Sequence, residues 1–197
     1  MSKYSEAFIP ETYYHIFDRA NGDELLFKSE ENYNFFHIKM KKYLLPYFEF
    51  QAYCLLPNHF HFVVKTKSIE EVQKLLPEIT ADNFNKKYLQ NCSNFLNSYA
   101  KSYNKYHKRM GSLFIERMKR VQIKTNQEII NAIFYVHKNP VHHGLVPSLS
   151  DWNNSSYKII KNGLEDDFIS PESVLRLFGG IVSFNKVHDS SYLSPNQ

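Results

Sequence analysis

Two apolar runs joined by a proline and an asparagine constrain the fold of this chain most. Residues 52–65 read AYCLLPNHFHFVVK, an apolar run that stops at Pro57 and Asn58 and then resumes. Short runs of this kind on either side of a two-residue turn are typical of a β-hairpin. The sequence therefore predicts two paired strands at 48–56 and 59–65.

The second predicted strand carries two histidines, His59 and His61, separated by one phenylalanine. Side chains alternate between the two faces of a strand, so both imidazoles should project from one face and Phe60 and Phe62 from the other. Two imidazoles that converge from a strand can form part of a metal site. Because structural histidines also occur at this spacing, the pair alone leaves both interpretations open.

Length and composition place the chain among ordinary globular proteins. It has 197 residues, of which 43% are hydrophobic and 16% aromatic, enough for one domain with a substantial core. The formal net charge of +4 permits nucleic-acid binding without requiring it. With only two cysteines and no apolar leader at the N-terminus, we expect a soluble, cytoplasmic protein without a disulfide framework.

The remaining patterns predict a single domain over residues 1–197 that alternates strands with helices. We expect an irregular, elaborated connection at about 66–92 with short helices near 69–76 and 83–89, and a C-terminal extension from about 158 that ends in a loose polar tail. Regular elements are expected at 12–18 (strand), 29–45 (helix), 93 to about 111 (helix), 118–123 (strand), 125–139 (helix, stopped by Pro140) and 171–178 (helix). This order predicts an α+β fold, one antiparallel sheet with packed helices.

The predicted helix at 125–139 carries a candidate nucleophile. At 100° per residue, Tyr135 lies in the middle of its polar face and Asn139 follows one turn later on the same side. A tyrosine oxygen can attack phosphorus and later leave, so Tyr135 can act in covalent catalysis. The alternative is a partly buried aromatic residue at a helix–sheet contact, and helix geometry alone does not decide between them.

Asn139 could also complete a metal site begun by the histidine pair. Two imidazoles and one amide oxygen would leave coordination positions open for water or a phosphate oxygen, as a catalytic site requires. Such mixed ligands suit Mg²⁺ or Mn²⁺ acting on phosphate, although Zn²⁺ or Co²⁺ would also bind imidazole.

The segment from Lys101 to Lys124, which begins inside the helix expected from residue 93, is basic and indicates contact with DNA. Its eight cations face a single acid, Glu116, whereas ordinary solvated faces mix charges of both signs. The tyrosines and phenylalanine interleaved with them could stack on unpaired bases, or could simply belong to the core. The candidate DNA-binding residues are Lys101, Lys105, Lys108, Arg109, Arg117, Lys119, Arg120 and Lys124.

Several ordered blocks together resemble one known family. LLPNHFHFVVK (55–65) is similar to the histidine–hydrophobic–histidine (HUH) motif of single-tyrosine transposases, in the branch of REP-associated tyrosine transposases. GSLFIERMKRVQI (111–123), FYVHKNPVHHGLV (134–146) and DWNNSSY (151–157) match in the same order, and YYHIFDRANGDELLF (13–27) resembles the family's opening strand and turn. The resemblance covers most of residues 12–157.

This resemblance implies a ferredoxin-like HUH fold and specific roles for four residues. His59 and His61 would be metal ligands, Tyr135 the nucleophile and Asn139 the third-ligand position. The implied activity is cleavage and rejoining of single-stranded DNA through a 5′-phosphotyrosine intermediate, often beside an imperfect hairpin.

Two other interpretations remain open at the level of sequence. A domesticated protein could bind hairpin DNA without cutting it, although drift should then have removed at least one of the four site residues. An RNA-binding ferredoxin-like domain would leave the histidine pair unexplained. The sequence also leaves open whether a monomer acts alone or a homodimer places Tyr135 of one chain beside the histidines of the other.

Overall fold

The computed structural model describes residues 4–115 and 117–189 and has the expected α+β architecture. One antiparallel sheet has the strand order β2-β3-β1-β4. Its strands are β1 (Tyr13–Arg19), β2 (Phe48–Leu56), β3 (His59–Thr66) and β4 (Lys119–Ile123), each within two residues of the predicted bounds. The two-residue Pro57–Asn58 connection joins β2 to β3, so the predicted hairpin is confirmed.

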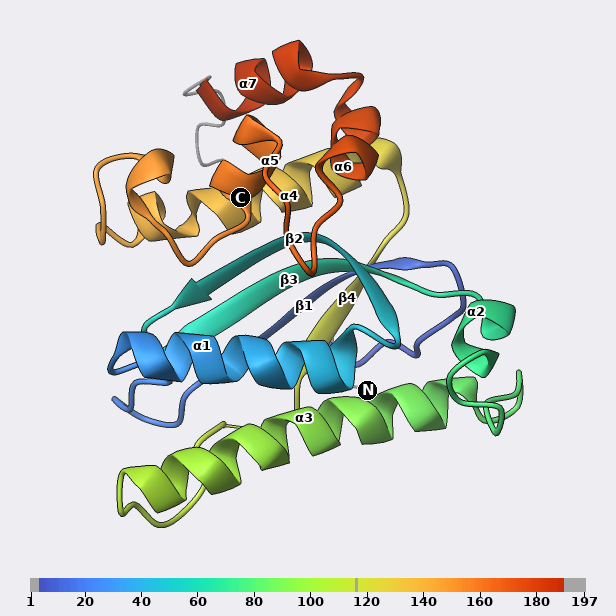
Figure 1. Cartoon of the computed structure of the whole chain (residues 1–197), viewed down its shortest axis with the longest axis vertical. Helices are drawn as coiled ribbons and strands as arrows, with labels where there is room; N and C mark the ends of the chain where they lie inside the picture. The colour runs from blue at the N-terminus through green and yellow to red at the C-terminus, as the bar shows by residue number, and fades with distance from the viewer. Residues whose placement is uncertain (1–3, 116, 190–197) are drawn as a thin grey trace.

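Helices cover both faces of this sheet (Figure 1). On one face lie α1 (Glu30–Lys39), its continuation as a π-helical turn, η1 (Met40–Leu44), and α3 (Phe84–Tyr106); α4 (Asn126–His142) lies on the other. The short helix α2 (Ile69–Gln73) lies to one side of the sheet. Beyond α4, on the side away from the sheet, are η2 (Leu149–Asp151), α5 (Tyr157–Asn162), α6 (Pro171–Phe178) and α7 (Ile181–Asp189).

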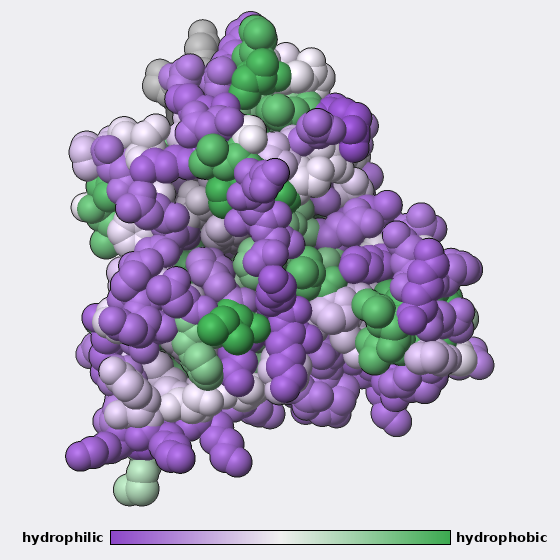
Figure 2. Space-filling view, viewed as in Figure 1, coloured by the Kyte–Doolittle hydropathy of each residue, from purple (hydrophilic) through white to green (hydrophobic). Residues whose placement is uncertain are grey.

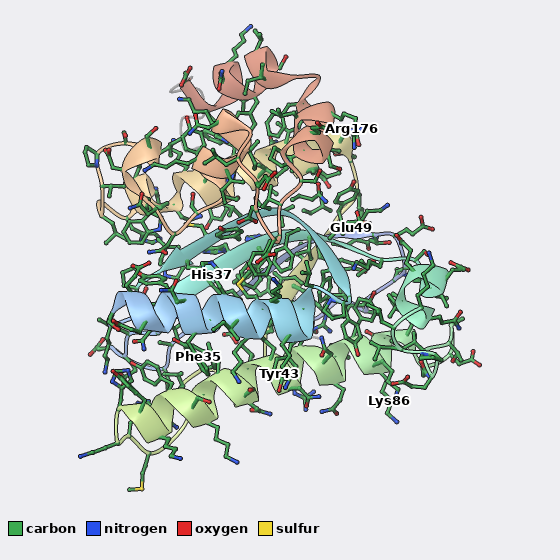
Figure 3. All side chains as sticks on the ribbon, viewed as in Figure 1. Phe35, His37, Tyr43, Glu49, Lys86 and Arg176 are labelled. Carbon is green, nitrogen blue, oxygen red and sulfur yellow. The ribbon has the colours of Figure 1, made fainter. Side chains whose placement is uncertain are left out.

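Aromatic rings fill the layer between the sheet and the α1–α3 pair. Phe36 on α1 has its ring centroid 5.3 Å from Phe60 on β3 and 5.0 Å from Phe95 on α3, and all three are fully buried. Figure 3 shows the neighbours of Phe36 on either side: His37 points toward the sheet and Phe35 toward α3. This layer accounts for much of the high aromatic content.

The outer surface is mostly hydrophilic on the face shown in Figure 2, where apolar side chains form only separate patches. Within the described part of the chain, no helix combines the length and apolarity needed to cross a membrane.

The sequence-based bounds of the long helix are wrong. The expected short helix near 83–89 and the helix from Ser93 are one continuous helix, α3. Its buried stripe runs without a break through Phe84, Tyr88, Cys92, Phe95, Tyr99 and Tyr103, at steps of three and four residues. The helix ends at Tyr106, short of Gly111, and Tyr106 itself is exposed rather than part of the stripe.

Two expectations about the second half of the chain are also wrong. Pro140 does not stop α4, which continues to His142. The proline removes only one N–H donor, so the following turn still forms, and the His143 N–H donates to the Asn139 carbonyl at 2.9 Å. The tail expected to be loose contains α7, whose Phe184 is fully buried. Residues 190–197 lie outside the described residues.

A chain of hydrogen bonds fastens α4 to β2 and α7. His188 Nδ1–H donates to the Phe184 carbonyl (2.8 Å), so its Nε2 accepts from His137 Nδ1–H (2.9 Å). His137 Nε2 then accepts from the Ser156 hydroxyl (2.9 Å), whose oxygen accepts from the Tyr53 N–H (2.9 Å). Each group in this buried chain has a defined role as donor or acceptor.

Replacing the hydroxyl at the centre of this chain should destabilise the protein. In Ser156→Ala, His137 Nε2 and the Tyr53 N–H both lose a partner inside the core, which should lower the free energy of unfolding by about 1–3 kcal/mol. Urea denaturation measures the change. The control is Ser102→Ala, a half-buried residue of α3 whose hydroxyl bonds only to the Ser98 carbonyl, and it should change stability by less than about 0.5 kcal/mol. Equal losses in both variants would contradict a structural role for the chain.

Candidate active site

The alternation of β3 places its two histidines on the side of the sheet that faces α4. Phe60 and Phe62 contact Phe36 in the opposite layer, so His59 and His61 must point away from it. Their ring centroids are 5.2 Å apart with the planes nearly perpendicular. The structure thus brings the two imidazoles together as the spacing predicted.

The helix α4 presents Tyr135 to these histidines. Thr125 caps the helix, its Oγ1 accepting the Glu128 N–H at 3.2 Å, which sets where the helix begins and hence which face Tyr135 occupies. The Tyr135 ring meets His61 edge to face, with centroids 5.6 Å apart, and 48% of its surface remains exposed. The ring therefore lies against His61 of its own chain and remains accessible from outside.

Asn139, one turn after Tyr135, has an amide oxygen without a partner. Its Nδ2 donates to the Tyr135 carbonyl at 2.8 Å, and this leaves Oδ1 buried and unbonded. Buried polar atoms are nearly always satisfied in folded proteins, so an unsatisfied oxygen on this face indicates a place for a ligand.

The two histidines each use one ring nitrogen within the protein. His59 Nδ1 lies 2.7 Å from Asn58 Oδ1, and His61 Nδ1 lies 3.0 Å from His15 Nε2. The Nε2 atoms of both rings are left for a ligand. Partners on the far nitrogen are the usual way in which proteins orient imidazoles that bind metals.

Burial keeps these imidazoles uncharged. Desolvation is the main cause that lowers the pKa of His59 to about 4 and that of His61 to about 2; the neighbouring His15, His59 and His143 contribute to the lowering at His61. Desolvation also lowers the pKa of His15 to about 4. Neutral rings are the form in which histidine can donate an electron pair.

The chemistry of these donors suits a divalent cation. Two Nε2 atoms and one amide oxygen are a mixed set that leaves further coordination positions open. No three His, Cys, Asp or Glu side chains in the described ranges are grouped in a way that could hold a metal, so a cation here would depend on Asn139 and on ligands from outside the protein.

The eight basic residues predicted to bind DNA divide into two groups. Arg109 binds Glu24 at 2.6 Å and the Ser112 carbonyl at 2.9 Å, and the buried Arg120 donates to the Glu6 and Ser5 carbonyls. These two guanidinium groups hold the fold together. The exposed or half-exposed members are Lys101, Lys105, Lys108, Arg117, Lys119 and Lys124.

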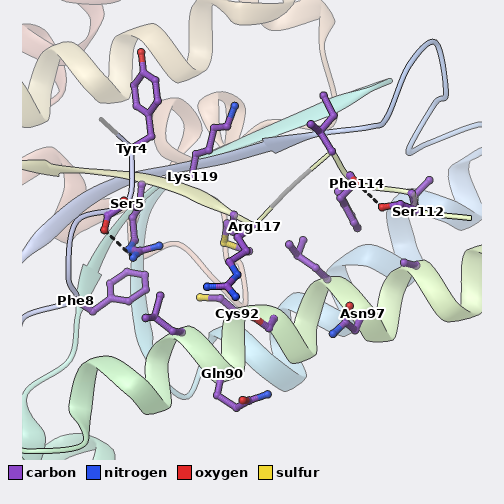
Figure 4. Close-up of a pocket in the computed structure, with 18 of the residues that line it drawn as sticks. Tyr4, Ser5, Phe8, Gln90, Cys92, Asn97, Ser112, Phe114, Arg117 and Lys119 are labelled. Atoms are coloured by element: carbon purple, nitrogen blue, oxygen red, sulfur yellow. Dashed lines mark hydrogen bonds between the residues drawn. The ribbon is translucent and has the colours of Figure 1, made fainter. Parts of the chain in front are cut away.

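Part of this exposed group lines a groove of about 1220 Å³ between α3 and residues 111–115 and 117–120. Lys101 lines it from α3, and Arg117 lines it from the opposite wall and reaches toward α3 (Figure 4). Lys119 also borders the groove, but it is paired opposite Phe17 on β1 and its side chain points away from α3. The groove lies beside α3, on the opposite side of the sheet from α4 and its tyrosine.

Sequence reasoning missed two histidines of the site. His15 on β1 contacts both His61 and Tyr135, with ring centroids 5.1 and 5.7 Å away. His143, at the end of α4, lies with its ring centroid 4.9 Å from that of His59. Its spacing from Asn139, four residues, is a signal that could have found it; His15 had none, because the register of β1 against β3 is not visible in the sequence.

Comparisons with known proteins point in the same direction as this geometry. A protein of Haemophilus influenzae named "Putative REP-associated tyrosine transposase" is 26% identical over 110 residues, which are 56% of this chain and 59% of that protein. The match thus spans less than two thirds of the relative's length. A solved structure of a REP-associated tyrosine transposase bound to a REP hairpin superposes with a TM-score of 0.60 at 17% identity, covering 86% of this chain and 91% of that one.

The resemblance is confirmed. This chain is similar to REP-associated tyrosine transposases in sequence, and it shares their fold. No family model matches the chain. The ferredoxin-like arrangement expected from the sequence is therefore that of the solved transposase.

Because the buried histidines stay neutral in the folded protein, the free energy of unfolding should already decrease as the pH is lowered from about 6.5, before the carboxylates take up protons. Between about pH 6.5 and 4.5 an unfolded histidine takes up a proton, whereas folded His61, with its pKa of about 2, does not, so acid favours the unfolded state. In His61→Gln this contribution is absent, and the slope of unfolding free energy against pH should be shallower by up to about 1.4 kcal/mol per pH unit. Urea unfolding at a series of pH values measures both slopes. Identical slopes would show that His61 is protonated as readily in the folded protein as in the unfolded chain.

Proposed function

We propose that this protein is a metal-dependent enzyme that nicks and rejoins single-stranded DNA beside a hairpin, as a tyrosine transposase does. The observation that supports it most is the contact of Tyr135 with His61, 74 positions apart in the chain. Asn139, one turn after Tyr135 on the same helix, adds an amide oxygen that lacks a partner. The names of the similar proteins, one of them bound to a REP hairpin, support the choice of DNA as substrate.

In the proposed reaction the Tyr135 oxygen attacks a backbone phosphorus of the DNA. A bond forms between this oxygen and phosphorus, and the bond from phosphorus to the 3′ oxygen breaks. The products are a 5′-phosphotyrosine link and a free 3′-hydroxyl; the phenol proton is lost to solvent and the leaving oxygen takes one up. Because the covalent link conserves the phosphodiester energy, a 3′-hydroxyl from either strand can reverse the step.

His59 and His61 through Nε2, and Asn139 through Oδ1, would hold the cation, Mg²⁺ or Mn²⁺. A bound cation would offset the charge that develops on the scissile phosphate. Glu128 is too distant to be the base, because it lies about two turns before Tyr135 on the same helix, where its carboxylate accepts the Lys124 N–H at 2.7 Å.

We further propose that Tyr135 and the histidines of one chain act together. Their rings are already in contact within one chain, so no exchange of α4 between two copies is needed to complete the site. The exposed cations around the groove beside α3 would hold phosphates of the same DNA molecule.

Tyr135→Phe should abolish covalent attachment to DNA. The protein, Mn²⁺ or Mg²⁺ and labelled single-stranded DNA with a hairpin are incubated, and a denaturing gel shows any protein–DNA adduct. The wild type should form the adduct and Tyr135→Phe should form none, because phenylalanine lacks the attacking oxygen. Tyr106→Phe, at another exposed tyrosine, is the matched control and should remain active. An adduct with Tyr135→Phe would overturn the assignment; hairpin binding without any adduct in the wild type would favour a binding protein that does not cut.

Removing cations from the groove should weaken the affinity for DNA by a similar factor whatever the DNA sequence, because phosphates are common to all sequences. Lys101→Ala and Arg117→Ala each remove one cation that would pair with a phosphate, so each should reduce the slope of log affinity against log salt concentration by about 0.7–0.9. Fluorescence anisotropy with a labelled hairpin at several salt concentrations measures this slope. Lys158→Ala, on α5 and outside the groove, should keep the wild-type slope. An unchanged slope in the two groove variants would remove this surface from the DNA path.

A further inference from the structure

His15 lies beside His61 and contacts that ring through both its ring face and a ring nitrogen. β1 and β3 are paired antiparallel with His15 opposite Val63 and Phe17 opposite His61, so His15 and His61 are diagonal neighbours on the α4 face. Their rings are stacked, with centroids 5.1 Å apart and planes 25° apart, and His15 Nε2 lies 3.0 Å from His61 Nδ1.

Only one of these two nitrogens can carry the shared hydrogen. If His15 Nε2 carried it, His61 Nδ1 would be the acceptor, and neutral His61 would have its own hydrogen on Nε2, the atom that faces the site. If His61 Nδ1 carries it, His61 Nε2 presents an electron pair instead. The choice of donor across this one contact therefore decides whether His61 can act as a ligand.

We propose that His15 is the positioning residue that accepts this hydrogen bond and so holds His61 in its Nδ1–H tautomer, with Nε2 free. The same arrangement exists at His59, whose Nδ1 faces the amide oxygen of Asn58. Because Nδ1 of each ring is engaged by the protein, Nε2 of each ring would present an electron pair to a ligand.

His15 contacts both His61, whose tautomer it would set, and Tyr135, the proposed nucleophile. Tyr135 packs edge to face on both rings, at 5.7 Å from His15 and 5.6 Å from His61. A phenylalanine at position 15 would keep an aromatic surface for Tyr135 but would provide no acceptor for His61. A glutamine would lose the ring but provide an amide oxygen as acceptor.

The value of the tautomer to catalysis rests on the proposed function, but the tautomer itself can be measured without metal or DNA. Long-range ¹H–¹⁵N correlation spectra of the metal-free, full-length protein show which nitrogen of His61 is protonated. We expect Nδ1–H in the wild type and in His15→Gln, and a shift toward Nε2–H in His15→Phe. An Nε2–H tautomer in the wild type, or a tautomer unchanged in His15→Phe, would overturn the inference.

Metal affinity supplies the second readout on the same three proteins. The electron paramagnetic resonance signal of free Mn²⁺ should show binding about 10–100-fold weaker in His15→Phe and close to wild type in His15→Gln. Equal weakening in both would mean that ring packing, not the hydrogen bond, matters, and would overturn the inference. If the tautomers are as expected but the wild type binds no Mn²⁺, the role of His15 stands and the proposed metal dependence is wrong.

Discussion

The pairing of β3 on both of its edges is the constraint on which the rest of this structure depends. β3 bonds to β2 through a two-residue turn and to β1 from the opposite side, and its side chains supply two different layers. Phe60 and Phe62 complete the aromatic core against α1, while His59 and His61 face α4. A slip of one residue would bury the imidazoles in an apolar layer and expose the phenylalanines, so the core and the site enforce the same register.

The second half of the site depends on contacts made by the end of the chain. Tyr135 and Asn139 are placed by α4, and α4 is fastened by His137 to Ser156 and to His188 on α7. The C-terminal helices thus have a structural part in the site although none of their side chains is among its donors. In this way His188, 51 positions beyond His137, helps to hold the helix that carries the proposed nucleophile, Tyr135.

The chemistry of the site follows from small polar groups held in largely buried surroundings. Burial keeps the imidazoles neutral, their outer nitrogens are occupied, and the bond from Asn139 to its own helix leaves its oxygen unpaired. The charged side chains, by contrast, lie mostly at the surface, and some of the basic ones are bound to oxygens of the protein itself. Arg109 and Arg120 bind protein oxygens, whereas the exposed cations beside α3 are the ones that the proposed function assigns to DNA phosphates.

The sequence by itself determined the element order, the hairpin and the faces of β3 and α4, because periods of two and 3.6 residues are local properties. It placed Tyr135 and Asn139 on one side of a helix and His59 and His61 on one side of a strand. It could not determine that α3 is one helix, that Pro140 lies inside α4, or that α7 is ordered, because packing against distant residues decides these. Only the tertiary structure brought His15 beside His61, since the register between strands 46 positions apart is set by the whole sheet and not by either segment.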